Sequence, residues 1–181
     1  MDDFKFNDRP NTGRLGQTIS EYATADTNVD AAALFLDLQW TYREMQKAYD
    51  DVLAEYDLTE TRFIILMFLF RADQQQLAPS EIATKLGATR PTVTKILNKL
   101  VVNGWVTKVS AVNDKRSVMI ELTTTGTLVL EKFLPHNFEA VQVIMSELSQ
   151  DEITTLSTLL HKVTIGTNKL NEKKETNHGN H

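Results

Sequence analysis

The segment RPTVTKILNKLV, residues 90–101, places polar and cationic side chains along one face of a predicted helix. At about 100° per residue, Val93, Leu97 and Leu100 fall together and must face a core. Hydroxyl and amide groups exchange hydrogen bonds with base edges, and lysine binds phosphate or guanine, so the opposite face suits a DNA major groove. An ordinary solvated face is the alternative, but such a face usually mixes acids with bases. The opposite face has no acid and consists of Pro91, Thr92, Thr94, Lys95, Asn98, Lys99 and Val102.

The segment VSAVNDKRSVMIELT, residues 109–123, alternates apolar and polar residues on both sides of a polar break, which predicts a β-hairpin. Arg116 at its tip is long enough to enter a minor groove, whose potential attracts arginine in A·T-rich DNA. Asp114 would hold the guanidinium in a fixed direction, while Asn113 and Lys115 would meet phosphates. Taken alone, the tip is an ordinary polar turn. Beside the helix just described, the DNA interpretation is favoured.

The charge of the chain is distributed unevenly. The 181 residues carry a formal net charge of −5, which by itself argues against a nucleic-acid partner. Residues 79–122, however, hold seven Lys/Arg against three Asp/Glu, a net +4, and the remainder carries −9. A basic middle in an acidic chain is a local field that attracts polyanions, although a chance cluster of solvated charges has the same composition.

Several classes of protein are excluded by composition. The chain has no cysteine, which excludes a disulfide scaffold, a thiolate metal site and a cysteine redox switch. The longest apolar run, FIILMFLF at residues 63–70, is far shorter than the ~20 residues of a membrane span. Residues 1–10 lack the apolar region of a signal peptide. We therefore expect a cytoplasmic protein with no membrane partner.

Catalytic motifs are absent from the sequence. It contains no Gly-rich phosphate loop, no H-E-x-x-H motif and no nucleophile elbow, so we expect no enzyme, no catalytic residue and no cofactor. His161 with Glu152 or His136 is a weak candidate for a metal site. A satisfied surface histidine is the better interpretation, and we expect no metal.

Two short helical segments predict a helix-turn-helix. The segment LAPSEIATKLG, residues 77–87, has Pro79 in its first turn and Gly87 at its end. Thr89 caps the next helix, and only about three residues separate the two. Strands at about 105–111 and 117–122 would follow as a wing.

Longer helices flank this unit. A helix is expected from Val29 to about Tyr56, with Thr27 and Asp30 as an approximate capping pair. Thr59 caps a second helix, apolar all round and therefore the buried centre of the domain. The first helix carries an apolar stripe along one face, formed by Leu38, Tyr42, Met45, Tyr49, Val52 and Tyr56.

The C-terminal part is also helical. Thr123 caps a helix that Pro135 should kink or break. Ser149 to Glu152 form a capping box for a last helix with an apolar face. We expect a mainly α fold with a small β-wing: a winged helix-turn-helix at residues 58–123, a flexible N-terminal extension at 1–27 and a disordered polar tail at 171–181.

From residue 58 to about 130 the sequence resembles the MarR family of bacterial winged-helix transcription regulators. LTETRFIILMFL resembles the helix before the reading head, and LAPSEIATKLGATRPTVTKILNKLVVNGWV resembles the two DNA-reading helices. NDKRSVMIELTTTG resembles the wing with its D-x-R tip and the L-T-x-x-G start of the next helix.

The resemblance implies a homodimer built from the first and last helices, here residues 28–57 and 124–170. It implies that the dimer binds double-stranded DNA at palindromic operators, usually as a repressor. Many members release DNA when a small, often phenolic or amphipathic, ligand enters a crevice between the dimerisation region and the reading head. Carried over by motif, the DNA contacts fall on Asp114 and Arg116 in the wing and on Thr89, Arg90, Thr92, Thr94, Lys95 and Asn98 in the helix.

The sequence departs from the family pattern at two positions. Ala78 stands where Ser or Thr often caps the first reading helix, and Pro91 stands where a small hydroxyl residue is common.

A winged helix that serves only as a protein-interaction or dimerisation module, without DNA binding, is the alternative function. A small aromatic effector is the possible ligand, although the aromatic residues that would line its crevice are more often core: Trp40, Tyr42, Phe63 and Phe68.

Overall fold

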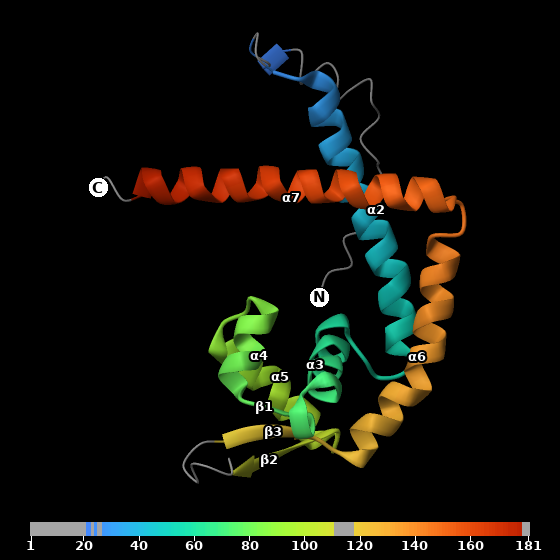
Figure 1. The fold of residues 1–181 in the computed structure, drawn as a ribbon, viewed down its shortest axis with the longest axis vertical. Coiled ribbons are helices and arrows are strands. Elements are labelled where there is room, and N and C mark those ends of the chain that lie inside the picture. Colours follow the sequence, from blue (N-terminus) through green and yellow to red (C-terminus); the bar gives the residue numbers. More distant parts are fainter. Residues whose placement is uncertain (1–20, 23, 25–26, 111–117, 179–181) are drawn as a thin grey trace. The chain divides into compact units, whose positions relative to one another are not determined.

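The computed structural model describes residues 21–22, 24, 27–110 and 118–178 of the chain (Figure 1). It divides into two compact units, Met1–Asn137 and Phe138–His181. The fold is mainly helical with a small antiparallel sheet, as predicted. Its elements are α2 (Val29–Ala54), α3 (Glu60–Arg71), the 3₁₀ turn η1 (Asp73–Gln75), β1 (Gln76–Leu77), α4 (Pro79–Leu86), α5 (Arg90–Val102), β2 (Val106–Ser110), β3 (Val118–Leu122), α6 (Thr124–Ile144) and α7 (Gln150–His178).

The two short helices α4 and α5 form the predicted helix-turn-helix (Figure 1). At the start of α4, Ala78 has no side-chain oxygen, but the carboxylate of Glu81 accepts a hydrogen bond from its N–H at 2.8 Å. Gly87 ends α4 with φ +62°, a left-handed conformation that favours glycine. Thr89 then caps α5, accepting from the N–H of Thr92 at 3.5 Å. Local chemistry therefore fixes both ends of the turn.

One hydrophobic core holds this unit together. The middle of α3 is buried, as its apolar composition predicts, and Ile65, Leu66 and Leu69 have no exposed surface. Thr59 caps α3 as expected, accepting from the N–H of Arg62. The rest of this core comes from Leu53 of α2, Leu58 before α3, Trp105 between α5 and β2, and the inward sides of α4, α5, the sheet and α6, namely Ile82, Ala83, Val93, Leu97, Leu100, Val106, Ile120, Leu122, Leu130 and Phe133.

The sheet has three strands in the order β1-β3-β2, all antiparallel. The hairpin of β2 and β3 runs from the pair Val106↔Leu122 to the pair Ser110↔Val118, within the predicted strands. The third strand, β1, was missed by the sequence analysis because its two residues follow a polar loop. It pairs at Gln76↔Glu121, where the Gln76 amide also donates to the Glu121 carboxylate at 3.1 Å.

The start of α2 differs from the prediction. Asn28 caps the helix, its Oδ1 accepting from the N–H of Ala31 at 3.0 Å. Thr27 instead accepts from the N–H of Thr24, so the predicted Thr27–Asp30 pair is wrong. Asparagine at the residue before the helix is as good a cap as threonine, and it lies one position closer. Farther along α2, Tyr49 donates a hydrogen bond to Asn137 of α6, and burial raises its pKa, with Glu60 and Asp50 adding to the effect.

The C-terminal helices also bring corrections. Helix α6 runs from Thr124 to Ile144 with Pro135 inside it, so of the predicted kink or break at this proline, the break is wrong. Ser149 and Glu152 form the predicted capping box, and hydrogen bonds from the Ser149 hydroxyl at 2.7 Å and the Ser149 N–H at 2.8 Å lower the pKa of the Glu152 carboxyl. Helix α7 runs to His178, so the disordered tail predicted from residue 171 is wrong for residues 171–178. Residues 171–178 contain no glycine or proline that would end the helix, and the first glycine of the tail is Gly179.

Candidate nucleic-acid interface

The face of α5 that was predicted to point outward is exposed to solvent. The inward residues Val93, Leu97 and Leu100 are buried, which confirms the partition expected from the helical period. Val102 is 85% exposed at the end of the same outward face. The other exposed residues on and next to this face are Thr89, Arg90, Pro91, Thr92, Thr94, Lys95, Asn98 and Lys99.

The threonines at the start of α5 are held by short local contacts. The hydroxyls of Thr89 and Thr92 lie 2.9 Å apart and share one hydrogen bond. The hydroxyl of Thr94 donates to the carbonyl of Arg90 at 2.9 Å. Because that proton is used within the helix, Thr94 offers a partner only an acceptor oxygen and a methyl group.

The charge of α5 is entirely positive. Arg90 lies in its first turn, Lys95 in its middle and Lys99 in its last turn, and its sequence has no acid. The N-terminus of a helix carries a partial positive charge that favours phosphate; in α5, Pro91 has no N–H and the N–H of Thr92 already donates to Thr89, so this partial charge and the Arg90 side chain are what attract an anion. With no carboxylate in the first turn to compete, this end of α5 can bind an anion.

A contact between α5 and the wing was missed by the sequence analysis. The Nζ of Lys108, on β2, donates to the Oδ1 of Asn98 at 3.1 Å. Lys108 lies within the basic residues 79–122 but is not among the predicted DNA contacts. The two residues are ten positions apart in the sequence, and the return of the chain from α5 into β2 brings them together. No local sequence pattern therefore predicts this contact.

The wing tip lies outside the described residues. Asn113, Asp114, Lys115 and Arg116 all fall within residues 111–117, so the predicted minor-groove contact stays a prediction. The strands that carry the tip are described, and their last pair is Ser110↔Val118.

The four aromatic residues proposed for the effector crevice, Trp40, Tyr42, Phe63 and Phe68, have different surroundings in the structure, and their ligand role stays a prediction. Phe63 belongs with the core, its ring lying edge-on to Phe133 with centroids 5.0 Å apart. Trp40 donates from Nε1 to the Glu44 carboxylate at 3.1 Å on α2. Tyr42 is also on α2 and is 52% exposed. Of the four, Phe68 alone lines the cavity described next.

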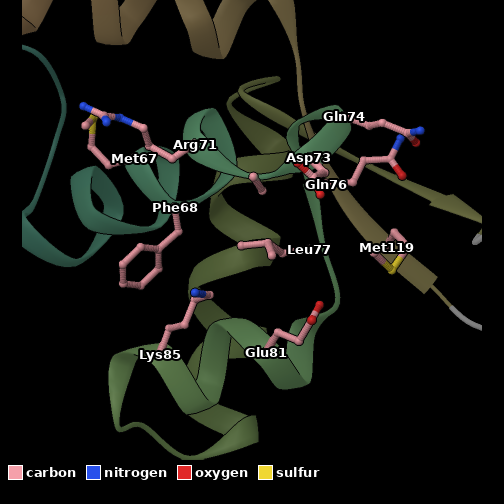
Figure 2. A pocket seen from close by; sticks show the side chains of 11 residues that line it. Met67, Phe68, Arg71, Asp73, Gln74, Gln76, Leu77, Glu81, Lys85 and Met119 are labelled. Carbon is pink, nitrogen blue, oxygen red and sulfur yellow. The ribbon is translucent and has the colours of Figure 1, made fainter.

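A cavity of about 620 Å³ lies between the end of α3, the turn η1, β1, α4 and β3 (Figure 2). Figure 2 shows the Phe68 ring and the Lys85 ammonium on the same side of this cavity, and the ammonium lies 5.7 Å from the ring centroid. Its border includes Gln74, which has a left-handed φ of +53° that is uncommon outside glycine. The lining residues are Met67, Phe68, Arg71, Ala72, Asp73, Gln74, Gln76, Leu77, Glu81, Lys85 and Met119.

Metal sites and membrane spans are two other features that the described residues can be tested for. Among the residues that the structure describes, no three His, Asp or Glu side chains gather as a metal site would require. Within the same residues, no helix combines the length and the apolarity needed to cross a membrane.

Comparison with known proteins identifies the family. The model for the transcriptional regulators SarA and Rot matches residues 47–133. The chain is 37% identical over 136 residues to the HTH-type transcriptional repressor YetL of Bacillus subtilis, an alignment that spans 74% of this chain and 81% of YetL. It is 30% identical over 124 residues to the multiple antibiotic resistance protein MarR of Escherichia coli K12, spanning 67% of this chain and 83% of MarR. The chain belongs to the MarR family of transcription regulators.

Solved structures agree with this assignment to the MarR family. A structure of the C80S mutant of Escherichia coli MarR complexed with operator DNA has a TM-score of 0.66 and 27% identity, covering 77% of this chain and 99% of that chain. The fold is also that of Sco3205, a MarR family regulator from Streptomyces coelicolor, with a TM-score of 0.71 at 20% identity over 79% of this chain and 91% of that chain. These findings support a transcription regulator and give no support to the interaction-module alternative.

Proposed function

We propose that this MarR family protein is a homodimeric repressor that binds a palindromic operator in double-stranded DNA. The observation that carries the proposal is the exposed, acid-free face of α5, with Arg90, Lys95 and Lys99 along one helix. Relatives named as repressors support repression as the outcome. The similar MarR of E. coli was solved in complex with operator DNA, which supports operator DNA as the ligand of this protein.

The residues of α5 divide by chemistry. Arg90 and Lys95 bind phosphate or guanine, while Asn98 reaches base edges. Thr94 contributes an acceptor oxygen and a methyl group that suits a thymine methyl. Thr89 and Thr92 lie at the helix start, where phosphate is favoured. At the wing tip, Arg116 enters the minor groove, oriented by Asp114, and Asn113 and Lys115 meet phosphates.

The dimer is supported by an apolar face that each chain leaves exposed. On α7, apolar side chains recur three or four residues apart on one side of the helix, between 37% and 51% exposed in the single chain. A second copy of the same helix covers such a stripe symmetrically, so each dimer carries two α5 helices, and reading successive turns of one DNA duplex requires them to lie about 34 Å apart. The residues of this stripe are Ile153, Leu156, Leu159, Leu160 and Val163.

A small aromatic effector is the second part of the proposal. DNA binding by BpsR of Bordetella bronchiseptica, which shares the fold at 20% identity, is described as regulated by 6-hydroxynicotinic acid. In this chain, the cavity beside Phe68 offers a ring to stack on, and its lining has two cations, Arg71 and Lys85, alongside two acids, Asp73 and Glu81. Thermal-shift screening of small aromatic acids tests it, with Phe68→Ala as the variant that should lose any stabilisation. The Trp40 and Tyr42 crevice remains the alternative place for the effector.

The proposed cellular location follows from the proposed ligand, operator DNA. A regulator of this kind acts in the cytoplasm, where the operator is, and it needs no metal, cofactor or catalytic residue to bind DNA.

Binding to duplex DNA at two salt concentrations tests the function. A protein that neutralises several phosphates releases their counterions, so affinity should fall steeply, by roughly 10³-fold or more for six contacts, between 50 and 200 mM salt. A module that binds only proteins would give no salt-dependent signal with any duplex.

A further inference from the structure

We propose that Lys108 determines base specificity by positioning Asn98, so that the two side chains together select guanine over adenine. This inference rests on the proposed function, because it requires α5 to lie in the major groove. It concerns which base is read, which the family assignment does not supply.

The geometry of the pair is fixed from both ends. Asn98 lies on the exposed face of α5, and Lys108 lies in the middle of β2, paired with the buried Ile120 of β3. Between them, the buried Trp105 donates its N–H to the carbonyl of Leu100 at 3.0 Å. The carbonyl of Trp105 accepts from the N–H of Thr123 at 3.1 Å. The connection from α5 to β2 is therefore pinned, and the two side chains meet on a rigid base.

The contact decides which way the Asn98 amide faces. An ammonium group has three donors and no acceptor, so only the Oδ1 of Asn98 can face the Nζ of Lys108, as it does at 3.1 Å. The Nδ2 of Asn98, with its two hydrogens, must then face away from Lys108. The amide is held as a donor toward anything that approaches the outward side of α5.

This orientation disfavours the usual pairing of asparagine with adenine. That pairing needs Oδ1 to accept from adenine N6–H₂ while Nδ2 donates to N7. In this protein Lys108 already occupies one lone pair of Oδ1, and its positive charge repels the adenine amino group. Guanine offers two acceptors, N7 and O6, which match the Asn98 Nδ2 donor and the Lys108 ammonium.

The surroundings of Asn98 reinforce this preference. Asn98 borders a shallow hollow of about 290 Å³ together with Arg62, Lys99, Val102 and Asn103. None of these five side chains is a carboxylate. The acid nearest along the wing strands, Glu121, accepts a hydrogen bond from Gln76 at the opposite edge of β3. A base edge made of acceptors therefore fits this end of α5 better than one that carries a donor.

The experiment uses the full-length chain and a pool of random duplexes. Selection with the wild type and with Asn98→Ala identifies the operator position whose preference depends on Asn98. We expect guanine there, preferred over adenine by roughly 5- to 150-fold, the range for a bidentate base contact. Lys108→Met keeps the side-chain stem and removes the ammonium, so the preference should fall to near unity or turn to adenine. Lys108→Arg keeps a donor and should retain guanine.

The control separates positioning from a simple phosphate contact. Lys99→Met removes an ammonium from the same helix without touching the Lys108–Asn98 contact, and it should weaken binding to guanine and adenine duplexes equally. Circular dichroism melts of all variants check that the exposed substitutions leave the fold intact.

Three results would overturn the inference. They are a position read by Asn98 that prefers adenine in the wild type, a Lys108→Met variant that loses the same affinity for both duplexes, and one that changes neither. If the wild type binds no duplex, the proposed function fails as well, so the two failures are distinguishable.

Discussion

Gly126, near the start of α6, lies directly against the backbone of Trp105, at the point where the chain leaves α5 for the wing. A Cβ at Gly126 would come 2.2 Å from the Trp105 carbonyl oxygen and 2.7 Å from Leu122 Cδ1. Beside this contact, Thr123 donates to the carbonyl of Gly104 at 2.6 Å and caps α6 by accepting from the N–H of Gly126 at 3.1 Å. The end of α5, the exit from the wing and the start of α6 are thus joined at one point.

Replacing Gly126 by alanine should destabilise the protein, because backbone has to move to admit the methyl group. We expect a loss of about 1–3 kcal/mol in the free energy of unfolding, the usual effect of overpacking a buried site. Gly166→Ala on α7 is the matched control, because nothing lies within 4 Å of its Cβ and alanine favours a helix. Denaturant unfolding of both variants measures the difference, and equal stabilities would contradict the packing described for Gly126.

Arg90 and Lys95 should each neutralise operator charge. Replacing either by alanine is expected to weaken DNA binding and to reduce the slope of log affinity against log salt by about one. Fluorescence anisotropy titrations at several salt concentrations give this slope. Lys47→Ala on α2, an exposed lysine of the same unit, should leave the slope unchanged; an Arg90 variant that behaves like it would remove Arg90 from the interface.

Arg116 should contribute to affinity and to the preference for flanking A·T pairs. Arg116→Ala removes the arginine expected to enter the narrow minor groove, so binding weakens and the preference beside each half-site relaxes. Selection of bound duplexes by this variant measures both effects. Unchanged affinity and unchanged flanking preference would show that the wing tip does not read the minor groove.

The exposed apolar stripe on α7 should be buried in a dimer. Size-exclusion chromatography with light scattering is expected to give twice the chain mass of 20.5 kDa at micromolar concentration. Leu159→Asp and Leu160→Asp, which place charge in the stripe, should shift the equilibrium toward monomer. A wild-type monomer at these concentrations would count against the paired reading heads.

The sequence predicted those features that nearest neighbours along the chain decide. The helical period alone separates buried Leu97 from exposed Asn98, and the caps at Thr59, Thr89 and Gly87 depend only on adjacent residues. Such local rules carry the same information in a sequence as in a structure.

Features made by distant contacts could not be predicted in this way. Strand β1 is two residues long, and it is a strand only because β3 lies beside it. The contact of Lys108 with Asn98 depends on how the wing folds back toward α5. Cap choices with several good candidates, such as Asn28 rather than Thr27, turn on small differences that sequence patterns do not resolve.

Selection of bound sequences from a random duplex pool tests the central claim most directly, that two α5 helices read one DNA duplex. The account predicts strong enrichment of an inverted repeat whose half-site centres lie about 10 base pairs apart, matching helices about 34 Å apart. Recovery of no common sequence, or of a single unrepeated half-site, would contradict it.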